Sequence, residues 1–327
     1  MNFSFDQKSL WLVVGVAFVL AVATAIGQIL RRRTDTSLNQ ATIDVFIHRI
    51  NGWWLMCSVL AVTLLLGRTV TVVLFGLVSF WALREFITLT PTRTADHRTL
   101  FWVFFFFTPL QYLLIGMGES QYGLYSIMIP VYAVLFILAR ASFSGDPKRF
   151  LERAAKIQAG LIVCVYCLSY APALMSLKIE GYPAPGNEGR NAGLLLFFVL
   201  VVQMGDAMRY VWDKAAGQRV IAPAINATKT WEGFTGGIGS ATLLGTAIWW
   251  VTPFPVWMAT LVSLLISVMG FCGGLTMSAI KRDRGVSDYG TLIEGHVGVL
   301  DRLDSICFAA PIFFHITRFL SGSGWLT

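Results

Sequence analysis

Charged residues are scarce in this chain. They make up 13% of its 327 residues, whereas hydrophobic residues make up 56%, and the mean hydropathy is +0.67. A soluble domain carries about 25% charged residues. The scarcity therefore excludes an ordinary soluble globular protein, and repeated apolar runs of bilayer length predict an all-α, polytopic helical membrane protein.

Cysteine is also scarce, with five residues scattered mostly through apolar runs. Cys164 and Cys167 form a C-x-x-C pattern, but they lie inside a predicted helix and no second pair accompanies them. We interpret them as small apolar residues and not as metal or redox ligands.

The chain lacks a Walker A sequence, an internal repeat, a low-complexity tract and a linker that separates soluble domains. Its formal net charge is +7. In a polytopic protein such an excess is typical of cytoplasmic Lys and Arg, so we expect no nucleic-acid partner.

About ten membrane spans are predicted. The first is Ser9–Ile26, which we expect to be retained with its N-terminus outside, because the stronger positive charge follows it. The other nine predicted spans are Trp53–Leu66, Thr69–Leu83, Leu100–Met117, Gly123–Ala139, Ala159–Leu177, Ala192–Met204, Gly236–Thr252, Val256–Cys272 and Ser305–Phe319.

The distribution of positive charge agrees with this layout. Of the 25 lysines and arginines, all but Lys8, Arg68, Lys178, Arg190 and Arg318 fall in the loops that the layout places in the cytoplasm. The two most polar loops, residues 206–232 and 278–304, lie on the same side. That placement suits a soluble, charged cosubstrate that arrives from the cytosol.

The final loop holds residues suited to phosphoryl chemistry. Asp288, Asp301 and Asp304 offer hard oxygen ligands, and Mg²⁺ is usually bound through one or two carboxylates plus substrate phosphates. Lys281 and Arg282 offer positive charge for phosphate oxygens. A second interpretation remains open, in which these residues form an Asp–Arg network that only ties helix ends together.

The other polar loop adds three candidates. Asp206 ends an apolar run, and a carboxylate at membrane depth indicates a functional site unless it only pairs with Arg209. Lys229 and Thr230 could hold phosphate. We expect Asp206, Lys229, Lys281, Asp288, Asp301 and Asp304 to converge on one polar cavity that faces the cytoplasm.

Two further features of the sequence each allow two interpretations. His296 suits either an acid–base and phosphate-binding role or a structural role in a glycine-rich loop. Arg84 and Glu85 end the third predicted span, where we expect a helix-end pair and hold a functional role as the alternative.

The order of these residues resembles a known signature. The pattern Ser278-x-x-Lys281-Arg282, Asp288, Gly290, Gly295-His296, Gly298, Asp301-Arg302-x-Asp304 resembles the C-terminal signature of the phosphatidate cytidylyltransferases, or CDP-diacylglycerol synthases. The upstream stretch Lys229-Thr-Trp-Glu232-Gly-x-x-Gly236-Gly237 is similar to that family's preceding element. Together they cover about 100 residues, whereas the first 190 resemble the family only as a helical membrane region.

The resemblance implies a membrane enzyme that condenses CTP with phosphatidate to give CDP-diacylglycerol and pyrophosphate, with Mg²⁺ as cofactor. It implies a transmembrane region over 1–190 and a catalytic region over 191–327, in a bacterial inner membrane, with a homodimer as one arrangement. The implied catalytic residues are Asp288, Asp301, Asp304, Lys281 and Arg282; the implied metal ligands are Asp301, Asp288 and Asp206. The implied substrate-binding residues are Ser278, Lys229, Thr230, His296 and Arg302.

Four positions depart from the family pattern. Ser287 stands where the family has Lys before the motif Asp, and Gly274 stands where it has an Asp of the metal site. Glu294 and Val297 interrupt the usual Pro-Gly-His-Gly-Gly. The departures indicate either a site rearranged for a variant substrate or weakened activity.

Three classes of function therefore stay open. The first is a cytidylyltransferase-like enzyme, and the second is a catalytically degenerate paralogue that binds lipid phosphate or a partner membrane protein. The third, a transporter, fits less well, because ionisable residues cluster in one-sided loops and not at the middle of the spans.

Overall fold

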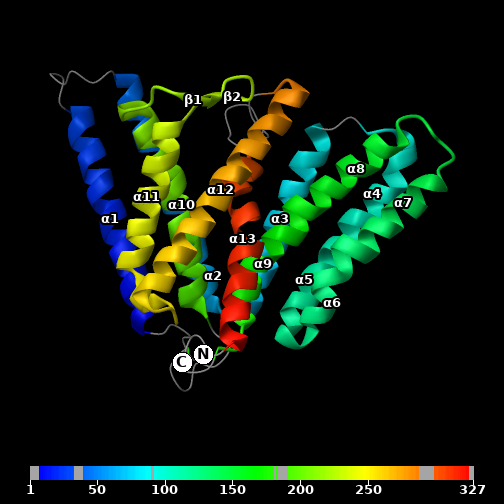
Figure 1. The fold of residues 1–327 in the computed structure, drawn as a ribbon, viewed down its shortest axis with the longest axis horizontal. Helices are drawn as coiled ribbons and strands as arrows, with labels where there is room; N and C mark the ends of the chain where they lie inside the picture. The colour runs from blue at the N-terminus through cyan, green and yellow to red at the C-terminus, as the bar shows by residue number, and fades with distance from the viewer. Residues whose placement is uncertain are drawn as a thin grey trace.

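A computed structural model describes residues 7–32, 40–89, 92–179, 182, 191–286 and 298–323. Over these residues the chain is an all-α bundle whose long helices run up and down between two ends (Figure 1). Helix α1 starts, and α13 finishes, at one end; the short strands β1 and β2 lie at the other, which we call the hairpin end.

The first half begins with three long helices and continues with three composite rods. The helices are α1 (Gln7–Arg32), α2 (Gln40–Leu66) and α3 (Arg68–Leu89). The rods combine short elements: η1 (Thr94–Asp96), α4 (His97–Trp102), η2 (Val103–Phe107) and α5 (Thr108–Met117); η3 (Glu119–Gln121), α6 (Tyr122–Ile127), η4 (Met128–Ala133) and α7 (Val134–Ser142); and α8 (Phe150–Gly160), η5 (Leu161–Cys167), α9 (Leu168–Ala173) and η6 (Leu174–Ser176).

The second half holds four helices and the hairpin. Helix α10 (Ala192–Ala215) leads to β1 (Val220–Ala222) and β2 (Asn226–Thr230), which pair antiparallel. Helix α11 (Trp231–Ala247) and η7 (Trp249–Val251) return across the bundle; α12 (Val256–Arg284) and α13 (Val299–Gly322) complete it.

The helices have the length and composition of membrane spans. Eight helical stretches in the described part of the chain are long and apolar enough to cross a bilayer, and the shorter apolar stretch Gly52–Leu66 lies within α2. Each of the ten predicted spans overlaps a helix of the structure, and α2 and α11 are the two outside those eight. The polytopic helical class is confirmed, while the total of ten crossings stays a prediction.

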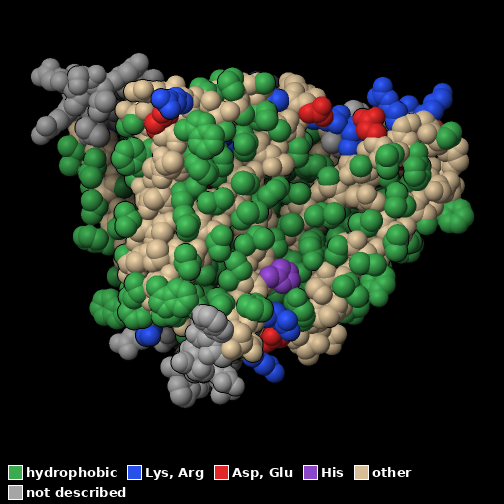
Figure 2. All heavy atoms as spheres, viewed as in Figure 1, with side chains coloured by type: hydrophobic (Ala, Val, Ile, Leu, Met, Phe, Trp, Pro, Cys, Tyr) green, Lys and Arg blue, Asp and Glu red, His purple; other side chains and the backbone are tan. Residues whose placement is uncertain are grey.

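Apolar side chains cover the outside as well as the core. Phe18, Leu77 and Leu243 are 69%, 66% and 73% exposed, as expected where lipid and not water is the surrounding solvent. Figure 2 shows hydrophobic side chains over the middle of one face, with charged side chains mainly toward the two ends. Inside, Phe198 stacks on Phe313 with ring centroids 5.3 Å apart, which joins α10 to α13.

One buried cluster spans the bundle and includes residues from α3, α9, α10 and α13. The proposed division near residue 190 is a statement about function, and this packing does not test it.

Candidate functional site

Three helices and the hairpin bring polar residues together toward the hairpin end of the bundle. Ser305 on α13 is the junction: its hydroxyl donates to Asp206 Oδ1 on α10 at 2.9 Å, and its backbone N–H donates to Asp304 Oδ1 at 2.7 Å. Two carboxylates 98 positions apart in the sequence thus approach the same serine.

Lys229 of β2 enters this cluster beside Gly274 of α12. A Cβ placed on Gly274 would lie 3.1 Å from Lys229 Nζ, 3.4 Å from Asp304 Oδ2 and 3.6 Å from Ser305 Oγ. The absent side chain at 274 therefore leaves room for the ammonium group. Gly274 lies at the polar cluster and is not closed off by a neighbouring helix backbone.

The environment of Lys229 disfavours its charge. Lys229 is 7% exposed, and burial, followed by the positive charge of Arg209, lowers its pKa to about 8. Asp304 and Asp206 oppose that shift, while Lys281 adds to it. The lysine is thus a buried cation held between two carboxylates and two other cations.

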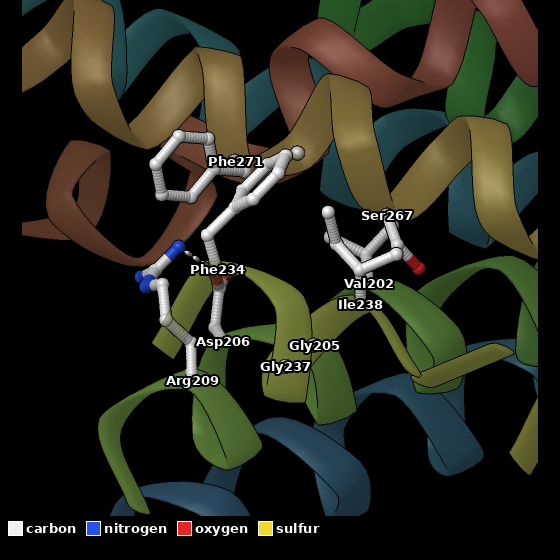
Figure 3. Close-up of a pocket in the computed structure, with 10 residues that line it drawn as sticks. Val202, Gly205, Asp206, Arg209, Phe234, Gly237, Ile238, Ser267 and Phe271 are labelled. Carbon is white, nitrogen blue, oxygen red and sulfur yellow. Dashed lines mark ion pairs between the residues drawn. The ribbon is translucent and has the colours of Figure 1, made fainter. Parts of the chain in front are cut away.

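Arg209 closes the other side of the cluster. Its Nη1 lies 3.0 Å from Asp206 Oδ1, and the pair borders a narrow cleft of about 10 Å³ between α10, α11 and α12 (Figure 3). Arg209 and Lys229 both lie over the Phe271 ring, 5.7 and 5.6 Å from its centroid, an arrangement that favours cations. Asp206 does pair with Arg209, but it also accepts from Ser305 and faces Lys229.

A second group lies at the C-terminal end of α12. Lys281 Nζ donates to Asp301 Oδ1 on α13 at 2.8 Å, and Arg282 Nε donates to the Ile225 carbonyl of the hairpin at 3.1 Å. The residues around the adjacent hollow of about 130 Å³ are Ile225, Asn226, Ser278, Lys281, Arg282 and Val286. Within it, Asn226 Nδ2 donates to Ser278 Oγ at 3.3 Å. The hollow has two cations on its wall, as an anionic ligand requires.

Thr230 begins α11. Its hydroxyl oxygen accepts from the Gly233 N–H at 3.0 Å and donates to Asp213 Oδ1 at 2.6 Å; its own N–H donates to the same oxygen at 2.9 Å. Thr230 is therefore an N-cap, tied to α10 through Asp213. Asp213 was not among the predicted site residues, although a threonine directly before a Trp-Glu helix start is a recognisable capping signal.

Arg302 lies on another side of α13 from Asp301. Its guanidinium is against Gly52 of α2, where an added Cβ would be 2.7 Å from Nη1. Within the described residues, the structure does not place Arg302 in the hollow with Lys281 and Arg282.

The predicted helix-end pair of Arg84 and Glu85 is wrong. Arg84 lies over the Trp81 ring, 5.1 Å from its centroid. Glu85 is 5% exposed and accepts the backbone N–H groups of Val299 at 3.1 Å and Leu300 at 2.9 Å. Its partners are therefore at the start of α13, which sequence spacing alone could not indicate.

A match to a known protein family covers the elements that carry these site residues. A model of the cytidylyltransferase family matches residues 47–320. The chain belongs to the cytidylyltransferase family. The match includes every helix from α3 to α12 and most of α2 and α13, so the first half of the chain is part of the family region as well.

Relatives of this family cover most of the chain. YnbB of Escherichia coli (strain K12), named only as an uncharacterized protein, is 37% identical over 272 residues, which are 83% of this chain and 87% of YnbB. The phosphatidate cytidylyltransferase of Bacillus subtilis (strain 168) is 30% identical over 227 residues, 68% of this chain and 77% of that protein. The phosphatidate cytidylyltransferase of Staphylococcus epidermidis is 36% identical over 192 residues, 54% of this chain and 74% of that protein.

Two predicted site residues of this cytidylyltransferase family member lie outside the described residues. They are Asp288 and His296, and the positions Ser287, Glu294 and Val297, which depart from the family pattern, lie in the same undescribed range. The cluster that the structure does describe holds Asp206, Lys229 and Asp304, with the pair of Lys281 and Asp301 beside the adjacent hollow. The roles predicted for all of these residues stay predictions.

The described carboxylates fit a magnesium ion only in part. Within the described ranges no three His, Cys, Asp or Glu side chains are grouped to hold a metal. Asp206 and Asp304 approach the same serine, and two carboxylates completed by substrate phosphates and water are a common magnesium environment. One Asp301 oxygen is already paired with Lys281. The donor set therefore fits an ion that binds together with a phosphate ligand.

Proposed function

We propose that this protein transfers the cytidylyl group of CTP to phosphatidate or a related lipid phosphate, giving CDP-diacylglycerol and pyrophosphate for phospholipid biosynthesis. The observation that carries the proposal is the convergence of Asp206, Lys229 and Asp304 from three separate elements. They meet beside Gly274, close to the cation-lined hollow at Lys281 and Arg282. Membership of the cytidylyltransferase family supports the reaction class.

The reaction needs positioning and charge stabilisation more than proton transfer. An oxygen of the lipid phosphate attacks the α-phosphorus of CTP, a new P–O bond forms, and the bond to the β-phosphate oxygen breaks as pyrophosphate leaves. A phosphate monoester is largely ionised near neutral pH, since its second pKa is about 6. No strong general base is therefore required.

Each residue then has a definable task. Lys281 and Arg282 would bind phosphate oxygens at the hollow, and Lys229 would meet the negative charge that reaches the buried cluster. Asp206 and Asp304, with Asp301 and Asp288 as the further predicted ligands, would hold Mg²⁺. That ion, when bound, neutralises charge on the transferring phosphates.

The proposed location is a bacterial inner membrane, with the hairpin end facing the cytoplasm. Cytoplasmic exposure brings CTP to the hollow from water, while the lipid phosphate arrives from the surrounding leaflet. The basic loops at this end support the orientation.

The test is turnover by purified full-length protein in detergent with CTP, phosphatidate and Mg²⁺, followed by pyrophosphate release and by mass spectrometry of the lipid product. Asp304→Asn should reduce turnover at least about a hundredfold, as expected where a lost charge acts on the transition state. Asp283→Asn is the matched control, because Asp283 is 69% exposed and pairs with Arg284 outside the cluster. Product formation unaffected by Asp304→Asn would contradict the proposal.

A second candidate is a catalytically inactive member that binds lipid phosphate or a partner membrane enzyme. The observation that favours it is the pairing of Asp301 with Lys281 and of Asp206 with Arg209, which satisfies carboxylates by protein cations. Saturable binding of phosphatidate by the folded protein, without pyrophosphate release at any Mg²⁺ concentration, would favour this alternative.

A further inference from the structure

Helix α13 begins without a capping side chain of its own. Its N-cap residue is Gly298 (φ −57°, ψ 149°), and no side-chain cap hydrogen bond forms there. The first N–H groups of a helix have no partner within the helix. In the described part of this helix start, Leu300 is fully buried, so its N–H needs a partner from elsewhere in the protein.

Glu85 of α3 supplies that partner. Its two carboxylate oxygens accept separately, Oε1 from the Val299 N–H at 3.1 Å and Oε2 from the Leu300 N–H at 2.9 Å. The indole N–H of Trp81 also donates to Oε1 at 3.1 Å. A carboxylate at a helix N-terminus is favoured by the helix dipole, and no ion pair with a described Lys or Arg competes for it.

The cap has a direct consequence for Asp301. Asp301 is the third residue of α13 and follows directly on Val299 and Leu300, whose N–H groups Glu85 accepts. The Asp301 carboxylate accepts from Lys281, with Oδ1 at 2.8 Å from Nζ, so the contacts that fix the first turn of α13 also fix the backbone that carries this pair. Helix α3 thus influences which way an acid of the candidate site is directed.

We propose that Glu85 is a positioning residue for the candidate site: it caps the first turn of α13 and so holds Asp301, the next residue of that turn, toward Lys281 and the hollow. The expected effect of Glu85 on turnover rests on the proposed function, whereas its capping of α13 does not. Glu85 acts through the first turn of α13 and not by contact with a substrate.

The first experiment measures the cap directly. In Glu85→Gln one oxygen acceptor becomes an NH₂ group that cannot accept, so backbone hydrogen exchange over residues 299–305 should become roughly tenfold faster or more, as expected for the loss of a charge-assisted hydrogen bond. The matched control is Glu119→Gln. Glu119 also accepts a backbone N–H, that of Lys178 at 2.9 Å, and it pairs with Arg318 near the C-terminal end of α13. Unchanged exchange in Glu85→Gln, or the same increase in Glu119→Gln, would overturn the proposal.

The second experiment asks whether Glu85 acts through Asp301. Pyrophosphate release is measured for Glu85→Gln, Asp301→Asn and the double variant. We expect Glu85→Gln to lower kcat on the order of tenfold to a hundredfold, as small displacements of catalytic groups do. The double variant should be no slower than Asp301→Asn alone. A double variant slowed by the product of the two single effects would contradict a role through Asp301.

The two experiments distinguish a failure of the proposed function from a failure of the capping role of Glu85. A wild-type protein that releases no pyrophosphate would remove the proposed function, and the exchange experiment would still decide the role of Glu85 as the cap. Glu85→Asp keeps the charge on a side chain shorter by one methylene, so its exchange and kcat should lie between those of the wild type and Glu85→Gln. It provides the same comparison if Glu85→Gln does not fold.

Discussion

Residue 274 is the position where the absence of a side chain matters most. Lys229 Nζ and Asp304 Oδ2 lie beside the point that a Cβ would occupy, so the glycine lets a lysine reach the carboxylates. A carboxylate added there would meet the far end of a flexible side chain, which can move. The neighbouring Gly273 differs, because its Cβ would lie 2.6 Å from the Asp304 carbonyl oxygen and 3.0 Å from Phe308 Cβ.

Gly274→Asp should therefore fold and should raise CTP turnover by about tenfold, since one charge-assisted contact to a bound ion or to Lys229 contributes roughly 1.5–3 kcal/mol. Steady-state pyrophosphate release and magnesium titration measure the effect. Gly273→Asp is the control and should yield little folded protein. Suppose that Gly274→Asp folds normally but binds magnesium no more tightly and turns over CTP no faster. That result would contradict the idea that activity is limited by a missing carboxylate at 274.

Lys229 is a second single residue with a testable effect, because it should make the stability of the protein depend on pH. Its pKa of about 8 in the fold lies below the value of about 10.4 for an unperturbed lysine. Between those values the unfolded chain binds more protons than the folded chain, so the free energy of unfolding rises with pH. Below pH 8 both states are protonated, and the cost of burying the charge is present in full.

We expect the thermal midpoint of metal-free wild-type protein to rise relative to that of Lys229→Met as the pH increases from 8 to 10. Taking the difference between the two proteins cancels the titration of the other lysines. If the thermal midpoints of the two proteins changed in parallel over that range, the pKa of Lys229 would not be lowered in the fold.

At the scale of elements, the hairpin and α11 are fixed by Thr230 and Asp213. The Asp213 carboxylate accepts from both the N–H and the hydroxyl of Thr230. A Cβ on Gly233 would lie 1.9 Å from Asp213 Oδ1, so a side chain at 233 would displace the carboxylate that holds Thr230. Thr230, which was predicted to bind phosphate, thus has a structural task in holding β2 and α11 together.

Thr230→Val and Asp213→Ala should each lower the stability of the protein by about 1 kcal/mol, the usual cost of losing an N-cap. Thermal unfolding in detergent and kcat measured on the folded fraction check this. Thr230→Ser, which keeps the hydroxyl, is the control. A large fall in kcat for Thr230→Val together with an unchanged midpoint would instead favour contact with phosphate.

Over the whole molecule, the two ends of the bundle differ in what they expose. The hairpin end carries the candidate site, whereas α13 finishes at the opposite end (Figure 1). A one-sided site is what a reaction between a water-soluble nucleotide and a membrane lipid requires. The positive-inside rule predicts that the hairpin end faces the cytoplasm.

We expect a cysteine at Ala216 to react with a membrane-impermeant maleimide only from the cytoplasmic side, and a cysteine at Ser323 only from outside. Both positions are exposed, and wild-type protein measures background labelling of the five native cysteines. Labelling of both positions from the same side would contradict the odd number of crossings, through α11, α12 and α13, that separates them.

Much of the architecture follows from the sequence alone. Bilayer-length apolar runs predicted the polytopic helical class, and each predicted span overlaps a helix, because hydrophobic length and helical hydrogen bonding are properties of one segment at a time. The order of Lys229, Lys281, Asp301 and Asp304 in polar loops indicated the family, which the match over residues 47–320 confirms.

Only the tertiary structure decided how those residues are used. The sequence did not show that Thr230 caps α11, that Arg302 lies against α2, or that Glu85 joins the start of α13 across 214 positions. Local periodicity tells which residues share a face of one helix, but not which face of another helix that face meets. Partners of buried polar groups are chosen by helix packing, since each group must be satisfied by whatever lies beside it in the folded bundle.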